Sequence, residues 1–208
     1  MKLNEVDRRQ IQALLKPVEK HTSWIGQVFA ANLLPVPADA LIVSLGVGQN
    51  CEELIHLREF AGPKATIRAF DIHLPSPKGV LAILGTDTDF QIADIKHIDR
   101  ITTSFYKSPA LIVSRHPQIV QGADNFGNIL SYNDWWLSCL TNWAKYALKN
   151  HSQMITTHYI IEEQERLNKY MQNAGLQPKT GTNQYFPRKF DQFLNARPDG
   201  FTLTFNGK

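Results

Sequence analysis

Along most of the chain, two kinds of segment with different patterns of apolar and polar residues follow one another in alternation. Short runs that are apolar almost throughout, such as 40–45, predict strands buried on both faces, as the central strands of a parallel sheet are. Longer segments such as 133–149 repeat apolar residues every three or four positions and predict amphipathic helices. We expect the large aromatic residues of that segment, Trp135, Trp136 and Trp143, to pack in the core. The alternation of the two kinds predicts parallel strands joined by crossover helices.

From residue 40 onward the pattern assigns an element to almost every segment. The predicted strands span residues 40–45, 65–72, 89–94, 110–114 and 153–157, and the predicted helices span residues 50–60, 78–84, 95–104, 133–149 and 160–174. Two further β-prone runs, 181–186 and 200–205, have no convincing helix between them and predict a closing antiparallel pair. The sequence therefore predicts an α/β fold with a doubly wound, mostly parallel sheet.

The beginning of the chain has a different character from the rest. Apolar residues repeat at helical spacing over 5–15 and predict an amphipathic helix, which we expect Pro17 to end. The chain has 208 residues, of which 43% are apolar, and this suffices for one sizeable core. We therefore expect one domain, 1–208, with an N-terminal helical lead-in at 1–38 and a core at 40–205.

Net charge, cysteine spacing and the lack of long apolar runs argue against several classes of partner. The net charge of +3 is too small to indicate a surface built mainly for phosphate backbones, so nucleic acid is not indicated as a partner. Cys51 and Cys139 lack the spacing of metal ligands, and we expect no metal site. The N-terminus resembles no targeting peptide, and no apolar run approaches about 18 residues, so we expect a cytoplasmic protein without a membrane partner. The sequence leaves the oligomeric state open.

A glycine turn joins the first predicted strand to the helix that follows it. Gly46 and Gly48, on either side of Val47, let the backbone turn tightly and let a ligand approach its amide groups. The N-terminus of the next helix then faces that ligand and favours an anionic or carbonyl-rich group. This spacing of glycines also occurs in turns that bind nothing, so other residues are needed to show whether this turn binds a ligand.

Two acids end the second and third predicted strands. Asp71 lies 23 residues after Gly48 (71 minus 48), where nucleotide sites place an acid on the ribose hydroxyls. Asp94 can accept a hydrogen bond from an adenine amino group, or it can cap a helix that begins near Ile95. With the glycine turn, these acids predict a nucleoside site at the carboxyl edge of the sheet.

Four segments, in this order, resemble the class I S-adenosylmethionine-dependent methyltransferases. They are SLGVGQN at 44–50, AFDI at 69–72, ADI at 93–95 and LIVSRHP at 111–117. The resemblance covers the core, and it implies a Rossmann-like fold with a seven-stranded sheet that ends in a C-terminal antiparallel hairpin. It also implies S-adenosylmethionine as the cofactor and methyl transfer as the reaction.

The resemblance implies a set of cofactor-binding residues. They are Ser44, Gly46, Val47, Gly48, Asp71, Ile72, Asp94, Ile95 and Ser114. In this set the glycine turn would face the methionine part and Asp71 the ribose. Asp94 and the Ile95 amide would face the adenine, and Ser114 would lie beside the methyl donor. Ser44 stands where the family commonly has an acid.

Arg115 and His116 follow the fourth predicted strand at the same edge of the sheet. The near-neutral pKa of imidazole would let His116 take a proton from a substrate hydroxyl or amine. Arg115 could hold a substrate carboxylate or phosphate. The Asn/Asp-Pro-Pro-aromatic motif of methyltransferases that modify base amino groups is absent. We therefore predict a small-molecule substrate.

Two alternative functions remain open. A catalytically inactive, methyltransferase-like binding module is favoured by Ser44 and by Asn50, which stands where the family commonly has a third glycine. A nicotinamide-dependent oxidoreductase would share the glycine turn and the acid after the second strand. Its fingerprint, however, needs a glycine where Cys51 stands.

Overall fold

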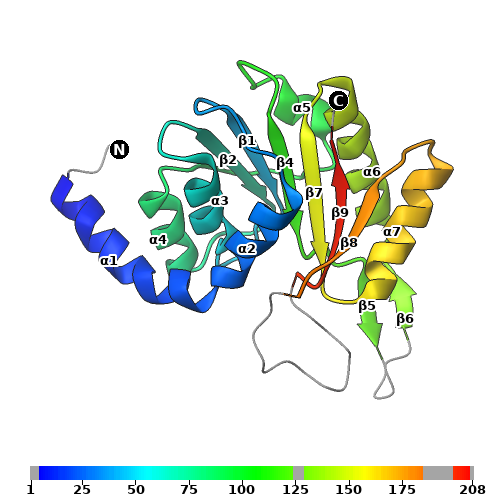
Figure 1. The fold of residues 1–208 in the computed structure, drawn as a ribbon, viewed down its shortest axis with the longest axis horizontal. Helices are drawn as coiled ribbons and strands as arrows, with labels where there is room; N and C mark the ends of the chain where they lie inside the picture. The colour runs from blue at the N-terminus through cyan, green and yellow to red at the C-terminus, as the bar shows by residue number, and fades with distance from the viewer. Residues whose placement is uncertain (1–4, 124–128, 185–198, 207–208) are drawn as a thin grey trace.

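The computed structural model describes residues 5–123, 129–184 and 199–206, which form an α/β structure (Figure 1). The helices are α1 Glu5–His21, α2 Ser23–Asn32, α3 Glu53–Ala61, α4 Pro77–Gly85, α5 Ile98–Thr102, α6 Asp134–Lys149 and α7 Ile161–Asn173. The strands are β1 Leu41–Leu45, β2 Thr66–Asp71, β3 Asp89–Ile92, β4 Leu111–Arg115, β5 Val120–Ala123, β6 Ile129–Tyr132, β7 Gln153–His158, β8 Lys179–Thr182 and β9 Phe201–Phe205.

Seven of these strands form one sheet in the order β3-β2-β1-β4-β7-β9-β8. The strands from β3 to β7 in this order pair in parallel, and β1 lies between β2 and β4 with all of its residues buried. Strand β9 runs antiparallel to both of its neighbours, β7 and β8. The predicted doubly wound sheet and its closing antiparallel pair are confirmed. The first strand of that pair begins at Lys179, earlier than predicted, and residues 185 and 186 of the prediction lie outside the described residues.

Helices cover both faces of the sheet, as Figure 1 shows. Helices α1, α2, α3 and α4 bury their apolar residues in one cluster with Ile42 of β1. Helices α5, α6 and α7 bury theirs in a second cluster with Leu41 and Val43 of the same strand. Successive side chains of a strand point to opposite faces, so β1 contributes to both cores. This two-sided burial explains why its sequence is apolar almost throughout.

Pro17 lies inside α1 and does not end it, contrary to the prediction. Proline removes one backbone hydrogen bond from a helix, but packing can hold the helix on both sides of it. Ile11 and Leu15 are buried before Pro17, and Val18 packs against the same core after it. The packing therefore carries the helix through the proline to His21.

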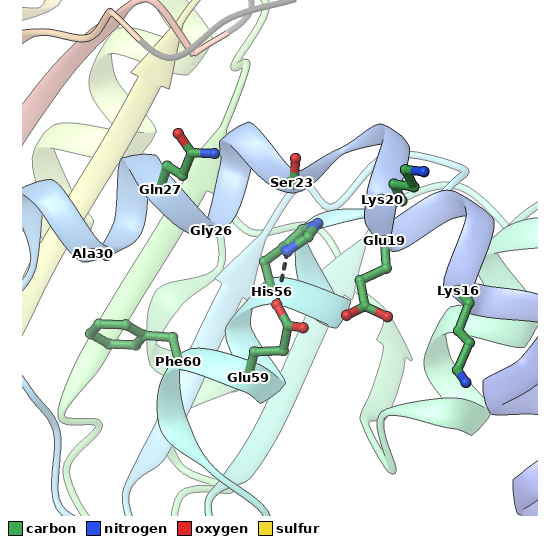
Figure 2. A pocket seen from close by; sticks show the side chains of 10 residues that line it. All are labelled: Lys16, Glu19, Lys20, Ser23, Gly26, Gln27, Ala30, His56, Glu59 and Phe60. Carbon is green, nitrogen blue, oxygen red and sulfur yellow. Dashed lines mark hydrogen bonds and ion pairs between the residues drawn. The ribbon is translucent and has the colours of Figure 1, made fainter.

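The structure contains three elements that the sequence pattern did not predict, helix α2 and strands β5 and β6. Helix α2 buries Ile25, Val28 and Phe29 and lies beside α3. Figure 2 shows Gly26 of α2 next to His56 of α3. Strands β5 and β6 pair antiparallel as a separate two-stranded sheet between β4 and α6. Each has only four residues, which is too short for a clear alternation of apolar and polar positions. In the part of the chain that the structure describes, no helix is long and apolar enough to cross a membrane.

Candidate nucleoside site

The glycine turn after β1 adopts a backbone that favours glycine. Gly46 and Gly48 both have φ of 64°, in the left-handed region that side chains with a Cβ rarely adopt. The Gly46 amide donates to the Phe70 carbonyl of β2 at 2.8 Å, which fixes the turn to the neighbouring strand. A Cβ on Gly46 would lie 2.7 Å from Cη2 of Trp136, whereas a Cβ on Gly48 would meet nothing within 4 Å. The two glycines therefore have different surroundings.

Asp71 connects the end of β2 to this turn. Its Oδ2 accepts from the Gly48 amide at 2.8 Å, and its Oδ1 accepts from the His73 amide at 2.8 Å. The His73 imidazole Nδ1 lies 3.2 Å from the same Oδ1, and the Asp71 side chain is only 7% exposed. The carboxylate is therefore held by backbone donors in one orientation. Carboxylate oxygens have further lone pairs, so it can still accept from a ligand.

A cavity of about 360 Å³ opens between the ends of β1, β2 and β4. It is lined by Gly46, Gly48, Asp71, Ile72, His73, Ile95, His116, Gln118, Asn133, Trp135 and Trp136. The two adjacent tryptophans are half-buried and stand edge to face, with ring centroids 4.9 Å apart. Both rings pack against the core cluster of this face of the sheet, as predicted, and they also line the cavity because α6 begins there. Trp143, the third tryptophan of that prediction, is fully buried.

A second cavity of about 230 Å³ lies on the other side of the glycine turn. It is lined by Gly46, Val47, Gly48, Gln49, Asn50, Cys51, Glu52, Glu53, Arg115 and His116. Gly46, Gly48 and His116 line both cavities, so the turn and the imidazole separate two adjoining spaces. The arrangement offers a larger space beside Asp71 and a smaller one at the N-terminal end of α3.

Arg115 and His116 meet a third buried residue, Asp199, which precedes β9. The Arg115 Nε lies 2.9 Å from both Asp199 carboxylate oxygens, and the His116 Nε2 lies 3.0 Å from Oδ1. The Asp199 carboxylate also accepts from the Trp24 indole at 3.0 Å and from the Thr157 hydroxyl. Its side chain is 1% exposed. Asp199 is therefore the centre of a buried polar cluster that joins β4, β7, α2 and β9.

The charges of this cluster shift one another's pKa values. Burial alone would raise the pKa of Asp199, but Arg115 and His116 hold it well below its usual range. Burial lowers the pKa of His116, although the Asp199 carboxylate opposes this shift. The His116 ring also packs on Tyr159, with centroids 3.8 Å apart. At neutral pH the cluster therefore contains an Arg115 and Asp199 ion pair beside a neutral imidazole.

No protein-family model matches the sequence, and no curated protein matches it. Solved structures do. Fibrillarin from Aeropyrum pernix, with natively bound S-adenosyl-L-methionine, has a TM-score of 0.56 and 13% identity, covering 87% of this chain and 76% of its own. A cyclopropane-fatty-acyl-phospholipid synthase-like protein from Lactobacillus casei has a TM-score of 0.60 and 11% identity, covering 90% of each chain. The fibrillarin pre-rRNA processing protein of Methanococcus jannaschii has a TM-score of 0.50 and 12% identity, covering 85% of this chain and 70% of its own.

The fold is that of the class I methyltransferases. The predicted fold is thereby confirmed, and β5 and β6 form a two-stranded sheet separate from the seven-stranded one. The similar structures include a pre-rRNA processing protein, so the fold does not separate small-molecule from RNA acceptors. The small-molecule substrate stays a prediction.

On this methyltransferase fold, six of the nine residues predicted to bind the cofactor line the two cavities. They are Gly46, Val47, Gly48, Asp71, Ile72 and Ile95. Asp94 lines neither cavity, because its side chain is turned to solvent and its Oδ1 accepts from the Lys96 amide at 2.9 Å. Ser44 and Ser114 are fully buried beneath the site. Within the described part of the chain, the Ser114 hydroxyl has no hydrogen-bond partner.

Sequence reasoning missed two buried acids of the candidate site. Asp199 lies 83 positions from His116 in sequence, but β9 starts at the edge where parallel strands end, because it runs antiparallel to β7. Glu53 begins α3, and its side chain is only 2% exposed. The Ser44 hydroxyl donates to Glu53 Oε1 at 3.3 Å, and burial raises the pKa of Glu53 to about 7. Among the described residues, no group of three His, Cys, Asp or Glu side chains could hold a metal ion.

Proposed function

We propose that this chain is a methyltransferase that binds S-adenosylmethionine at the glycine turn. The observation that carries the proposal is the cavity of about 360 Å³ between the turn and Asp71, at the carboxyl edge of the sheet. Open α/β sheets bind ligands at this edge, and small-molecule sites begin at about 300 Å³. The alternative of a nicotinamide-dependent oxidoreductase is disfavoured by the antiparallel β9 and by the buried Cys51.

The side chains around the two cavities suit the parts of this cofactor. The fixed Asp71 carboxylate can accept from both ribose hydroxyls, and the apolar Ile72 and Ile95 can contact the adenine faces. The smaller cavity at the start of α3 would take the amino-acid part. The exposed amides of a helix N-terminus favour the carboxylate of that part.

For catalysis we propose that His116 takes a proton from the acceptor. Bound S-adenosylmethionine supplies an electrophilic methyl group, so the protein has to align the acceptor, exclude water and, where needed, remove a proton. His116 lies at the junction of both cavities, and its lowered pKa keeps the imidazole neutral and able to accept. Arg115 is committed to Asp199, so we assign it the role of holding that carboxylate beside His116.

As the acceptor we propose a small molecule. The small net charge of +3 supports this choice, because binding to a nucleic-acid backbone usually requires a strong excess of basic residues. Methyl transfer from radiolabelled S-adenosylmethionine to total RNA or to a small-molecule extract would distinguish the two classes. Label in the RNA fraction alone would contradict the small-molecule proposal.

Replacing Asp71 with alanine tests the cofactor proposal. We expect the affinity for S-adenosylhomocysteine to fall at least about tenfold by calorimetry, because the ribose loses a charged acceptor worth about 1.5 to 3 kcal/mol. An Asp71→Asn variant keeps one acceptor for the Gly48 amide and separates ligand binding from collapse of the turn. Asp99→Ala, at an exposed site on α5, serves as the control.

S-adenosylhomocysteine should also raise the melting temperature of the wild type, whereas NAD should not. Unchanged affinity in both Asp71 variants, or stabilisation by NAD alone, would contradict the cofactor proposal.

A further inference from the structure

Glu53 places a carboxyl group in the interior, close to the smaller cavity. It is the first residue of α3, where an acid ordinarily faces solvent and stabilises the helix terminus. Here the side chain turns inward to the end of β1, is 2% exposed, and accepts from Ser44 Oγ at 3.3 Å. The residue lines the cavity of about 230 Å³ together with the glycine turn.

No cation among the described residues is paired with this carboxyl group. Arg115 is the nearest source of positive charge, and it lowers the pKa of Glu53 only partly, because its Nε is bound to both oxygens of Asp199. Glu52 and Cys51 flank the group in sequence, and the field of Asp199 opposes its ionisation. Burial of an acid without its own cation normally favours the neutral form. Glu53 is thus an acid without a cation partner, next to an open space.

We infer that Glu53 binds the primary ammonium group of an amino-acid moiety in the smaller cavity, and that it loses its proton as it does so. The inference rests on the proposed function, because the ligand that brings the ammonium is the cofactor. An ammonium group supplies both the missing positive charge and hydrogen-bond donors. The carboxylate of the same moiety would face the N-terminus of α3, where anions are favoured.

The proton balance makes this inference measurable. At neutral pH Glu53 is close to half protonated, since burial raises its pKa to about 7. A bound ammonium favours the charged carboxylate, so binding sends the carboxyl proton to the buffer. The ligand affinity should therefore rise with pH below about 7 and level off above it. Arg115 and Asp199, which stay charged over this range, face Glu53, as does Ser44, which does not titrate. The same cavity is also lined by Cys51, Glu52 and His116. Burial raises the pKa of Cys51 to about 12 and lowers the pKa of His116, so the thiol and, above its pKa, the imidazole are neutral.

Two ligands separate the amino-acid part from the nucleoside part. S-adenosylhomocysteine contains both, and 5′-methylthioadenosine lacks the amino-acid moiety. In calorimetry near pH 8 we expect Glu53→Gln to lower the affinity for S-adenosylhomocysteine by about tenfold, which corresponds to the loss of one charged hydrogen bond. The same variant should leave 5′-methylthioadenosine unchanged. Glu162→Gln is the matched control, because Glu162 is likewise an acid in the first turn of a helix, but this residue is exposed and lines neither cavity.

Proton release is a second readout that needs no variant. The wild type, titrated with S-adenosylhomocysteine near pH 6.5 in buffers of different ionisation heat, should release a substantial fraction of one proton, and about none with 5′-methylthioadenosine. Equal effects of Glu53→Gln on both ligands, or no ligand-specific proton release, would overturn the role of Glu53. The Asp71 variants would still report on the nucleoside site in that case. If the wild type binds neither ligand, the proposed function and this inference both fail.

Discussion

Replacing Asp199 with alanine should lower the free energy of unfolding by about 3 to 5 kcal/mol, the cost of breaking a buried ion pair. The substitution leaves the Arg115 guanidinium, whose side chain is 12% exposed, without its carboxylate. It also removes the acceptor of the Thr157 hydroxyl and the Trp24 indole. Alanine is further disfavoured at this position because Asp199 has φ of 53°. Urea denaturation at neutral pH measures the loss.

Two companion variants separate the causes of that loss. Asp199→Asn keeps hydrogen-bonding atoms and tolerates the left-handed backbone, so only the charge is lost. Its urea midpoint should therefore lie between that of the wild type and that of Asp199→Ala. Asp39→Ala removes an ion pair with Lys107 at the surface and should leave the midpoint unchanged. A midpoint for Asp199→Ala equal to that of Asp39→Ala would contradict the importance of the buried cluster.

The pH dependence of stability also tests the contribution of the Asp199 carboxylate. The folded-state pKa of Asp199 lies below its unfolded value, so its contribution is fully present above about pH 3.9 and is lost as pH falls through the folded value. The difference in stability between wild type and Asp199→Asn should therefore persist down to about pH 4 and shrink below it. A difference that disappears at higher pH would indicate another titrating group.

The features that the sequence predicts correctly are those that depend on residues close together along the chain. The buried strand β1 and the glycine turn after it are local patterns, and both are found where expected. The closing pair of strands was also predicted, because the sequence between the two β-prone runs has no convincing helical pattern. Pro17 shows the limit of local rules, because α1 continues through it on the packing of Ile11 and Leu15 against α4.

The missed parts of the site depend on residues that are distant in sequence or turned unexpectedly. Asp199 reaches Arg115 only because β9 enters the sheet antiparallel beside β7, and a single sequence does not reveal that position. Glu53 looks like an ordinary acid in the first turn of a helix, and only the short connection from β1 turns it inward toward Ser44. Trp136 packs against the core as its helical spacing predicts, but it also lines the cavity, because α6 begins there.

Replacing Gly46 with alanine should lower the free energy of unfolding by about 2 to 5 kcal/mol and weaken the binding of S-adenosylhomocysteine. The left-handed backbone costs about 1 to 2 kcal/mol for a residue with a Cβ. The contact at 2.7 Å with Trp136 adds about 1 to 3 kcal/mol of overpacking. The indole can relieve the contact only by moving, and it forms part of the cavity wall. Urea denaturation and calorimetry measure the two effects.

Gly48 provides the matched control for the same substitution. Its φ is also 64°, but a Cβ there meets nothing within 4 Å, so Gly48→Ala should pay only the backbone cost of about 1 to 2 kcal/mol. Adding Trp136→Leu should recover part of the loss in Gly46→Ala and none in Gly48→Ala, because only Gly46 meets the indole. Equal losses for the two alanine variants, unaffected by the second change, would show that the backbone alone requires glycine and that Trp136 does not restrict the turn.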